Sequence, residues 1–356
     1  RGEGGVVISD GVEKPHNNFD FVLLTNNMND EENTALKKKI MGNLEPIINK
    51  IKIGIDLSVT SASKLKHASC RIIWYDMRFG HKTILGNKDF VPSLTHFTIP
   101  KIPDWDARNL LVNRGTLMII NDLLLEKQEL DENFKKLIVK HIVKAIVGYG
   151  DTLLYFLDDY DWSYVEKQKR MRNRNDVDIE FKEIYDEAMN FRFQPTYDDF
   201  MKRDFTKWMD KLRVHFERIF LFCESKRLKK KDLNWDNYAD TAFKFALSDE
   251  MFKCKPFAKK VIYFLKSKSY PGHGSLGSKL GFKTLDDAGV LPILFPLFAY
   301  HLENDYYREI AAKFLASKNR EFRNLRKAYL NYWGRTGDVN FINILTKYEI
   351  SLNAEA

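Results

Sequence analysis

The stretch NNFDFVLLT, residues 17–25, decides how the first part of the chain is interpreted. Its apolar residues predict a short strand from Phe19 to Thr25, after an approach rich in turn-forming residues. One acid, Asp20, lies between two phenylalanines at the start of this strand. Charged side chains are rarely buried without a partner. Asp20 is therefore interpreted either as a turn residue facing solvent or as a metal ligand at a strand end.

A second strand is predicted from IKIGIDLSV, residues 51–59, where apolar and polar residues alternate. Alternation with a period of two places Asp56 on the polar face of this strand, together with Gly54 and Ser58. Between the two strands, residues 30–44 carry apolar side chains at helical spacing, with lysines opposite. The order strand, helix, strand is therefore expected over residues 19–59.

The remaining pattern predicts an α+β protein with two domains. RIIWYDMR (71–78) and KTILG (82–86), joined by a turn at residues 79–81, predict a β-hairpin. After Asp104 the apolar residues recur at helical intervals as far as about Tyr348. We expect a small mixed-sheet α/β core at residues 1–104 and a large α-helical domain at residues 105–356.

Composition sets limits on the class of protein. The 356 residues have a net charge of +8 at neutral pH, which suits an anionic ligand. No apolar run approaches the roughly 18 residues that cross a bilayer, so membrane insertion is not expected. Three widely spaced cysteines fit a reducing compartment, and we predict a cytoplasmic location. The chain opens at RGEGG without a methionine, and we expect a segment to precede it.

Two carboxylates on neighbouring strands can converge on one cation. Mg²⁺ prefers carboxylate oxygens and substrate phosphates, so Asp20 and Asp56 are the candidate ligands. The glycine-rich turn at residues 1–5 offers backbone N–H groups that can hold phosphate oxygens. Together these features are the physical minimum for nucleotidyl transfer, with Mg²⁺ or Mn²⁺ as the expected cofactor.

These residues, read in order as RGEGG, NNFDFVLL, GIDLSV and GHKTILGN, resemble the core of the nucleotidyltransferase superfamily, which has the DNA polymerase beta-like fold. In that family a Gly-Ser turn leads to a strand with an Asp-x-Asp motif, and a later strand supplies a third acid. The resemblance implies that Asp20 is the second acid and Asp56 the third. It implies that Arg1, Gly2 and Glu3 form the end of the phosphate-binding turn, in a core whose start is missing.

The chain departs from the family pattern at Asn18, where the first acid should stand. An asparagine offers an oxygen to a metal but no negative charge, so the resemblance makes Asn18 the third metal ligand. Three explanations stay open: a divergent or inactive family member, an engineered substitution, or a wrong assignment of the motif.

The resemblance predicts an enzyme that moves a nucleoside monophosphate from a nucleoside triphosphate to an unidentified acceptor. Two alternatives remain. The first is a catalytically inactive nucleotidyltransferase-like protein that serves as a binding module or scaffold. The second is an RNA-binding or tRNA-modifying protein that uses the basic runs at residues 166–175 and 226–232, although a solvated helix face is the favoured interpretation of both runs.

Several weaker signals complete the prediction. In the family the helical domain often closes over the nucleotide, which makes Arg114 and Lys140 candidate phosphate-binding residues, with Lys144 and Asp151 as lesser ones. The alternative for such basic residues is a side chain that extends to solvent. GHGSLG (272–277) matches a dinucleotide motif but lacks the preceding strand, and DDYDW (158–162) is interpreted as a solvated loop in preference to a metal site.

Overall fold

The structure is a computed structural model that describes residues 6–9, 12–15, 18–126, 129–246, 256–265, 280–285, 287–315, 317–336 and 345–346. It is mainly helical, with two small sheets, as the α+β prediction required in outline. The chain divides into two compact units. The first is Arg1–Ala107 with Leu157–Thr196, and the second is Arg108–Phe156 with Tyr197–Ala356.

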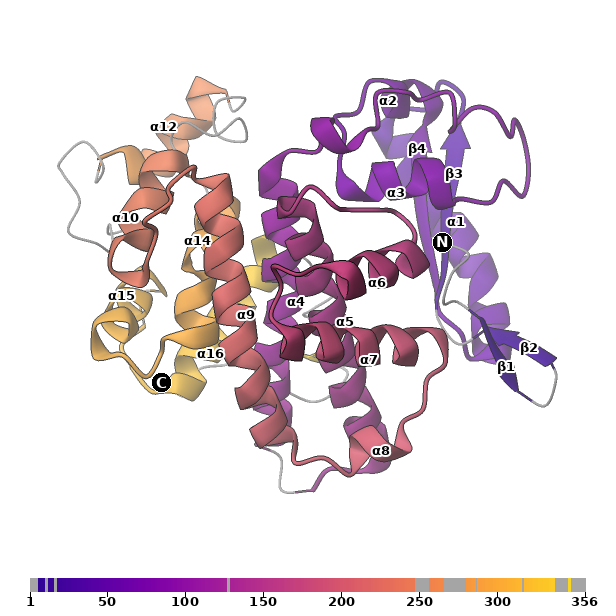
Figure 1. Cartoon of the computed structure of the whole chain (residues 1–356). Helices are drawn as coiled ribbons and strands as arrows, with labels where there is room; N and C mark the ends of the chain where they lie inside the picture. The colour runs from indigo at the N-terminus through magenta and orange to yellow at the C-terminus, as the bar shows by residue number, and fades with distance from the viewer. Residues whose placement is uncertain are drawn as a thin grey trace. The chain divides into compact units, whose positions relative to one another are not determined.

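The strand–helix–strand order predicted near the N-terminus is confirmed. Strand β3 (Phe19–Thr25), helix α1 (Asp30–Ile51) and strand β4 (Ile55–Ser61) follow one another, and β3 and β4 pair in parallel (Figure 1). A separate antiparallel pair joins β1 (Val6–Ser9) to β2 (Val12–Pro15). Among the described residues the parallel and antiparallel pairs therefore form two separate sheets, where a single mixed sheet was expected.

The ends of α1 follow from local chemistry. Asn29 caps the N-terminus and accepts a hydrogen bond from the backbone of Glu32, whose carboxylate in turn accepts from the backbone of Asn29. At the other end Lys52 adopts a left-handed conformation and donates its backbone N–H to Ile48. The helix thus continues to Ile51, so the second strand starts at Ile55 and not at Ile51 as predicted.

The predicted hairpin at residues 71–86 is wrong. Residues Ile72–Gly80 form helix α3, and the described residues 82–86 lie in no strand. The apolar residues in RIIWYDMR are adjacent as well as alternating, which a helix accommodates equally well. Burial of Ile72, Tyr75 and Asp76 on one side of α3 decides for the helix, because these residues are three and four positions apart.

The first unit is completed by a segment from the middle of the chain. Helices α6 (Tyr164–Asn173) and α7 (Ile179–Phe193) pack on each other. The loop before them reaches α3: the hydroxyl of Tyr160 donates to both carboxylate oxygens of Asp76, at 2.9 and 3.2 Å, and the indole of Trp162 packs on Gly80. Short helices α2 (Ala62–Lys66) and η1 (Ile99–Lys101) lie in the same unit.

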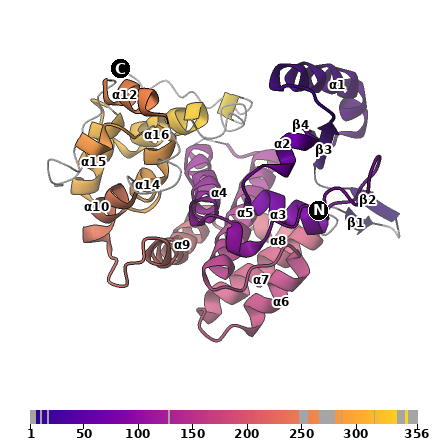
Figure 2. The same cartoon turned by 90° about the horizontal axis from the view of Figure 1, so that it is seen from above.

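The second unit is built from helices alone in its described part. Helix α4 (Asp104–Leu125) begins just before the unit boundary, and α5 (Glu132–Phe156) packs on α8 (Asp198–Met201) and α9 (Phe205–Arg227). A second group consists of α10 (Trp235–Ala246), α12 (Phe257–Leu265), α14 (Asp287–Tyr300), α15 (Asp305–Leu315) and α16 (Phe322–Thr336). The apolar helix α14 lies among α9, α10, α15 and α16 (Figures 1 and 2). None of the described helices is both long and apolar enough to cross a membrane.

Candidate functional site

The parallel pairing of β3 and β4 brings the two predicted acids opposite each other. In the register of the sheet Asp20 is the partner of Asp56. Partners in adjacent strands project to the same face of the sheet, so both carboxylates lie on one face. Both residues are exposed. The structure therefore presents two carboxylates side by side, open to solvent, at the beginning of two parallel strands.

Asn18 joins these two acids. Its side-chain amide donates a hydrogen bond to a carboxylate oxygen of Asp56, with Nδ2 and Oδ2 3.2 Å apart. The backbone N–H of Phe19 donates to the carbonyl of Gly54 at 2.9 Å, which extends the strand pairing past the last register pair. Asn18, Asp20 and Asp56 are thus gathered within three residues of the start of both strands. We call these three residues the strand-end cluster.

Gly54 leaves the space that Asn18 occupies. A Cβ atom at this position would lie 2.8 Å from Oδ1 of Asn18, closer than real Cβ atoms approach an oxygen. The sequence prediction placed Gly54 on the polar face but assigned it no role. The signal was present, because a glycine inside an alternating strand often marks close approach of another group.

Helix α1 and the far ends of the strands hold this sheet in place. The hydroxyl of Thr25, at the end of β3, donates to the side chain of Asn33 on α1 at 2.7 Å, and both residues are buried. On α2, the amine of Lys64 donates to the carboxylate of Asp30 at 2.7 Å. These polar contacts link α1 to both strands, directly or through α2, at the end opposite to the strand-end cluster.

The chemistry of the cluster fits a hard divalent cation. Two carboxylates and one amide offer only oxygen ligands, the kind that Mg²⁺ binds, and an exposed position leaves room for the waters and phosphates that complete its shell. In the present arrangement Asn18 uses its amide nitrogen to satisfy Asp56, so its oxygen is not directed to that carboxylate. The residues present can hold Mg²⁺ or Mn²⁺ through Asp20 and Asp56, with Asn18 as a neutral ligand.

The other predicted phosphate-binding residues are not part of this geometry. Arg1, Gly2 and Glu3 lie outside the described residues, as does GHGSLG at 272–277. Arg114 and Lys140 belong to the second unit. The stem of Arg114 packs on Gly148 of α5, and the amine of Lys140 lies 6.0 Å from the centre of the Tyr197 ring. Their role in phosphate binding stays a prediction, as does that of exposed Lys144 and buried Asp151.

DDYDW lies in a loop, as predicted, and Asp158 is exposed, but the other two acids of the segment are ion-paired. Asp161 accepts from the guanidinium of Arg170 at 2.6 Å, and Asp159 accepts from that of Arg174 at 3.3 Å. Arg174 also pairs with Asp176, which raises its pKa, and Arg172 pairs with Asp186 on α7. The arginines of the basic run 166–175 are thus engaged by neighbouring acids.

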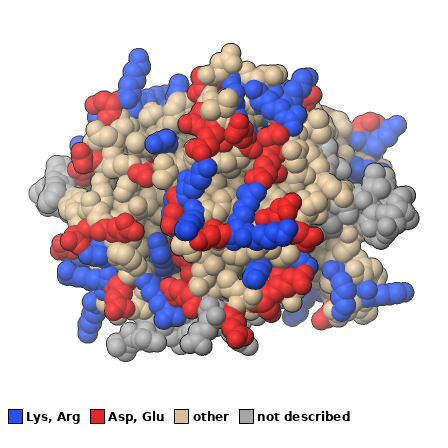
Figure 3. All heavy atoms as spheres, turned by 60° about the horizontal axis from the view of Figure 1, so that its bottom comes forward, with Lys and Arg blue, Asp and Glu red and all other residues tan. Residues whose placement is uncertain are grey.

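This pairing weakens the RNA-binding alternative for that run. An arginine held by a carboxylate must break that pair before it can bind a phosphate. On the face drawn in Figure 3, basic and acidic side chains are interspersed, without a continuous basic band across the described residues. In the second run, at residues 226–232, Arg227 is buried and its guanidinium donates to the carboxylate of Glu224 at 2.6 Å. This arginine is therefore also engaged by an acid.

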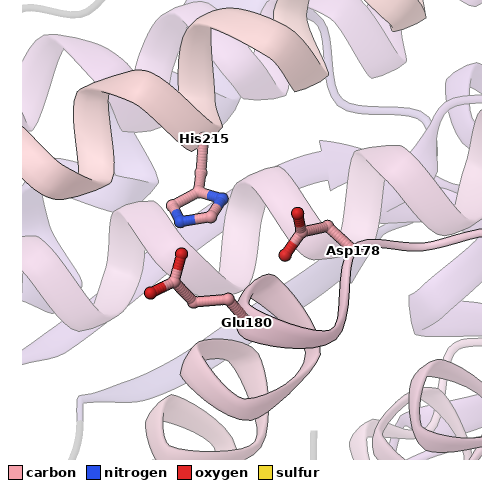
Figure 4. A group of neighbouring side chains, drawn as sticks. All are labelled: Asp178, Glu180 and His215. Atoms are coloured by element: carbon pink, nitrogen blue, oxygen red, sulfur yellow. The ribbon is translucent and has the colours of Figure 1, made fainter.

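One further group of metal-ligand residue types occurs among the described residues: Asp178, Glu180 and His215 (Figure 4). Asp178 already has a structural role, since its carboxylate caps α7 and accepts from the backbone N–H of Phe181 at 3.1 Å. Asp178 and Glu180 belong to the first unit and His215 to the second. We assign no metal site to this group.

Comparison with known proteins adds no relative: no family model, no curated protein and no solved structure matches the chain. The functional interpretation therefore depends on the residues of the chain and their arrangement.

Proposed function

We propose that this protein is a metal-dependent nucleotidyltransferase of the DNA polymerase beta-like class. The observation that supports this most directly is the register that pairs Asp20 with Asp56 on parallel strands, with Asn18 hydrogen-bonded to Asp56. The motif resemblance names these same three residues as the metal ligands. A different register of β3 on β4 would have separated the two carboxylates along the strands or placed them on opposite faces.

In the proposed reaction an acceptor oxygen forms a bond to the α-phosphorus of a nucleoside triphosphate. The bond from that phosphorus to the bridging oxygen breaks, and pyrophosphate leaves. A bound Mg²⁺ would neutralise charge on the triphosphate and lower the pKa of the attacking hydroxyl. Asp20 and Asp56 would hold the ion, and one of them or a water would take the proton of the acceptor. Positioning and electrostatic stabilisation supply most of the rate in such reactions.

The test is release of pyrophosphate from nucleoside triphosphates in the presence of Mg²⁺, measured for the wild-type chain and for Asp20→Asn and Asp56→Asn. Each substitution should lower the rate by about 100-fold or more, because it removes a charge that holds the ion. Glu45→Gln is the matched control, since it neutralises an exposed acid of α1 outside the cluster and should leave the rate unchanged. Equal activity of all four proteins would refute the proposal.

The second candidate is a catalytically inactive nucleotidyltransferase-like protein that serves as a binding module or scaffold. Asn18 favours it, because two carboxylates bind a divalent ion more weakly than three. Asn18→Asp in the same assay separates the two candidates. An active but impaired enzyme should gain pyrophosphate release with this variant. No release from either protein, together with no Mg²⁺-dependent nucleotide binding, would support the scaffold.

A further inference from the structure

Helix α12 has an unusual distribution of exposed residues. Phe257, Val261, Phe264 and Leu265 recur at the spacing of one helical face. In most proteins such a face turns toward the core. Here all four side chains are exposed, with Phe257 at 81% and Leu265 at 74% of full exposure. The less exposed residues are Lys260, which flanks this face beside Phe257 and Phe264, and Tyr263, which lies on the opposite side, where Ile262 is also exposed.

The sequence on both sides of α12 carries charge of one sign only. Between Met251 and Leu285 the sequence contains eight lysines and no aspartate, glutamate or arginine. The net charge of the whole chain is +8, so this stretch accounts for all of it. Lys259 and Lys260 lie on α12 itself, and the amine of Lys283 lies 5.7 Å from the centre of the Phe264 ring. A basic and apolar helix therefore stands in a chain that is otherwise electrically balanced.

We propose that α12 binds the surface of a membrane that contains anionic lipids. An exposed apolar face beside lysines is the pattern of helices that lie in the membrane interface: the apolar side chains enter the acyl boundary and the lysines contact the lipid phosphates. The helix has nine residues, which corresponds to a length of about 14 Å. It is too short to span a hydrocarbon core of roughly 30 Å, so it lies along the surface.

A lipid surface fits this face better than a nucleic acid does. Lysines would serve either partner, because both present phosphates. Phe257 and Phe264 could stack on bases, but Val261 and Leu265 on the same face are aliphatic and offer a nucleic acid neither a stacking surface nor a hydrogen bond. In a membrane the same side chains gain the free energy of leaving water. The inference does not depend on nucleotidyl transfer, since α12 contains none of the proposed catalytic residues.

The test is flotation of the full-length chain with vesicles of phosphatidylcholine, with and without phosphatidylglycerol. The wild-type chain should bind the anionic vesicles, and added salt should weaken the binding. Phe257→Asp and Leu265→Asp should each lower the partition coefficient by about tenfold or more, because a charge replaces buried apolar area. Lys259→Glu should lower it by about fivefold or more.

Two matched controls keep the result specific. Leu85→Asp changes a leucine that is 91% exposed in the first unit, and Lys38→Glu reverses an exposed lysine of α1; neither should alter binding. Circular dichroism of each variant verifies that it is folded. The proposal is overturned if the wild-type chain ignores anionic vesicles, or if the α12 variants bind as tightly as the controls. It is equally overturned if the α12 variants abolish binding to single-stranded RNA, or self-association of the chain, and leave vesicle binding intact.

Discussion

At the scale of single residues, the candidate site depends on small side chains as much as on acids. Asn18 donates a hydrogen bond to Asp56 at a position where a third carboxylate would repel it. Gly54 makes that contact sterically feasible, since a Cβ there would press on the Asn18 oxygen. Asparagine at position 18 adds a hydrogen bond and no third negative charge, which favours the placement of two acids side by side on an exposed sheet.

Gly54→Ala tests this arrangement. The new methyl group displaces the end of an exposed side chain, so the free energy of unfolding should change by less than about 1 kcal/mol. The affinity for Mg²⁺, measured by isothermal titration calorimetry, should fall severalfold because Asn18 moves. Gly42→Ala is the control: a Cβ at Gly42 meets nothing within 4 Å, so it should leave metal affinity unchanged. Unaltered affinity in Gly54→Ala would remove Asn18 from the site.

At the scale of elements, two helices illustrate what local sequence can and cannot predict. The helical spacing of apolar residues at 30–44 and the alternation at residues 51–59 are local signals, and both α1 and β4 were predicted from them. Helix α3 was predicted as a strand, because its apolar residues fit either period. The helical conformation places Asp76 in the interior. There it is 1% exposed and accepts a hydrogen bond from Tyr160, a residue 84 positions away in the chain. No local pattern reveals that partner.

Tyr160→Phe tests the contact between α3 and the later segment. It removes a hydroxyl that donates to a buried carboxylate, which should lower the free energy of unfolding by about 1–3 kcal/mol. Urea denaturation followed by circular dichroism measures this change. Tyr306→Phe removes the hydroxyl of an exposed tyrosine and should change stability by less than about 0.5 kcal/mol. Equal effects of the two substitutions would show that the Asp76 contact adds no stability.

At the scale of the whole molecule, the second unit buries several ionisable groups among its helices. Glu224 and Arg227 are both buried and paired, and the hydroxyl of Tyr238 also donates to Glu224. Burial raises the pKa of Glu224, but its two arginine neighbours and Tyr238 lower it by more, and the net pKa is lowered. His141 is also buried: its ring donates from Nδ1 to the side-chain oxygen of Asn121 at 2.8 Å, because the amide nitrogen of Asn121 donates to Ile138.

Part of the pH dependence of stability follows from His141. Burial, followed by the charges of Lys144 and Lys140, lowers its pKa from 6.5 to about 3. Its folded pKa is below its unfolded pKa, so its contribution to stability is fully present above pH 6.5 and is lost as the pH falls toward 3. Between pH 7 and pH 5 this loss should be about 2 kcal/mol.

His141→Gln should remove that part of the pH dependence, which urea denaturation at the two pH values measures. The variant is expected to be less stable at pH 7, so the readout is the difference between the two pH values and not the stability itself. His67→Gln replaces an exposed histidine and should keep the wild-type difference. A His141→Gln chain that loses as much stability on acidification as the wild type would contradict the assignment of a neutral buried histidine.

The sequence by itself determined the elements whose signals are local: the strand with Asp20, the helix after it, the strand with Asp56 and the helical character of the later chain. Alternation and helical spacing involve residues close together, so they can be read without knowing the fold. Only the tertiary structure decided that Asp20 and Asp56 are partners in register, that residues 72–80 form a helix, and that residues 157–196 join the first unit. Each of these depends on contacts between residues far apart in the chain. A short stretch of sequence carries no information about the free energy of such contacts.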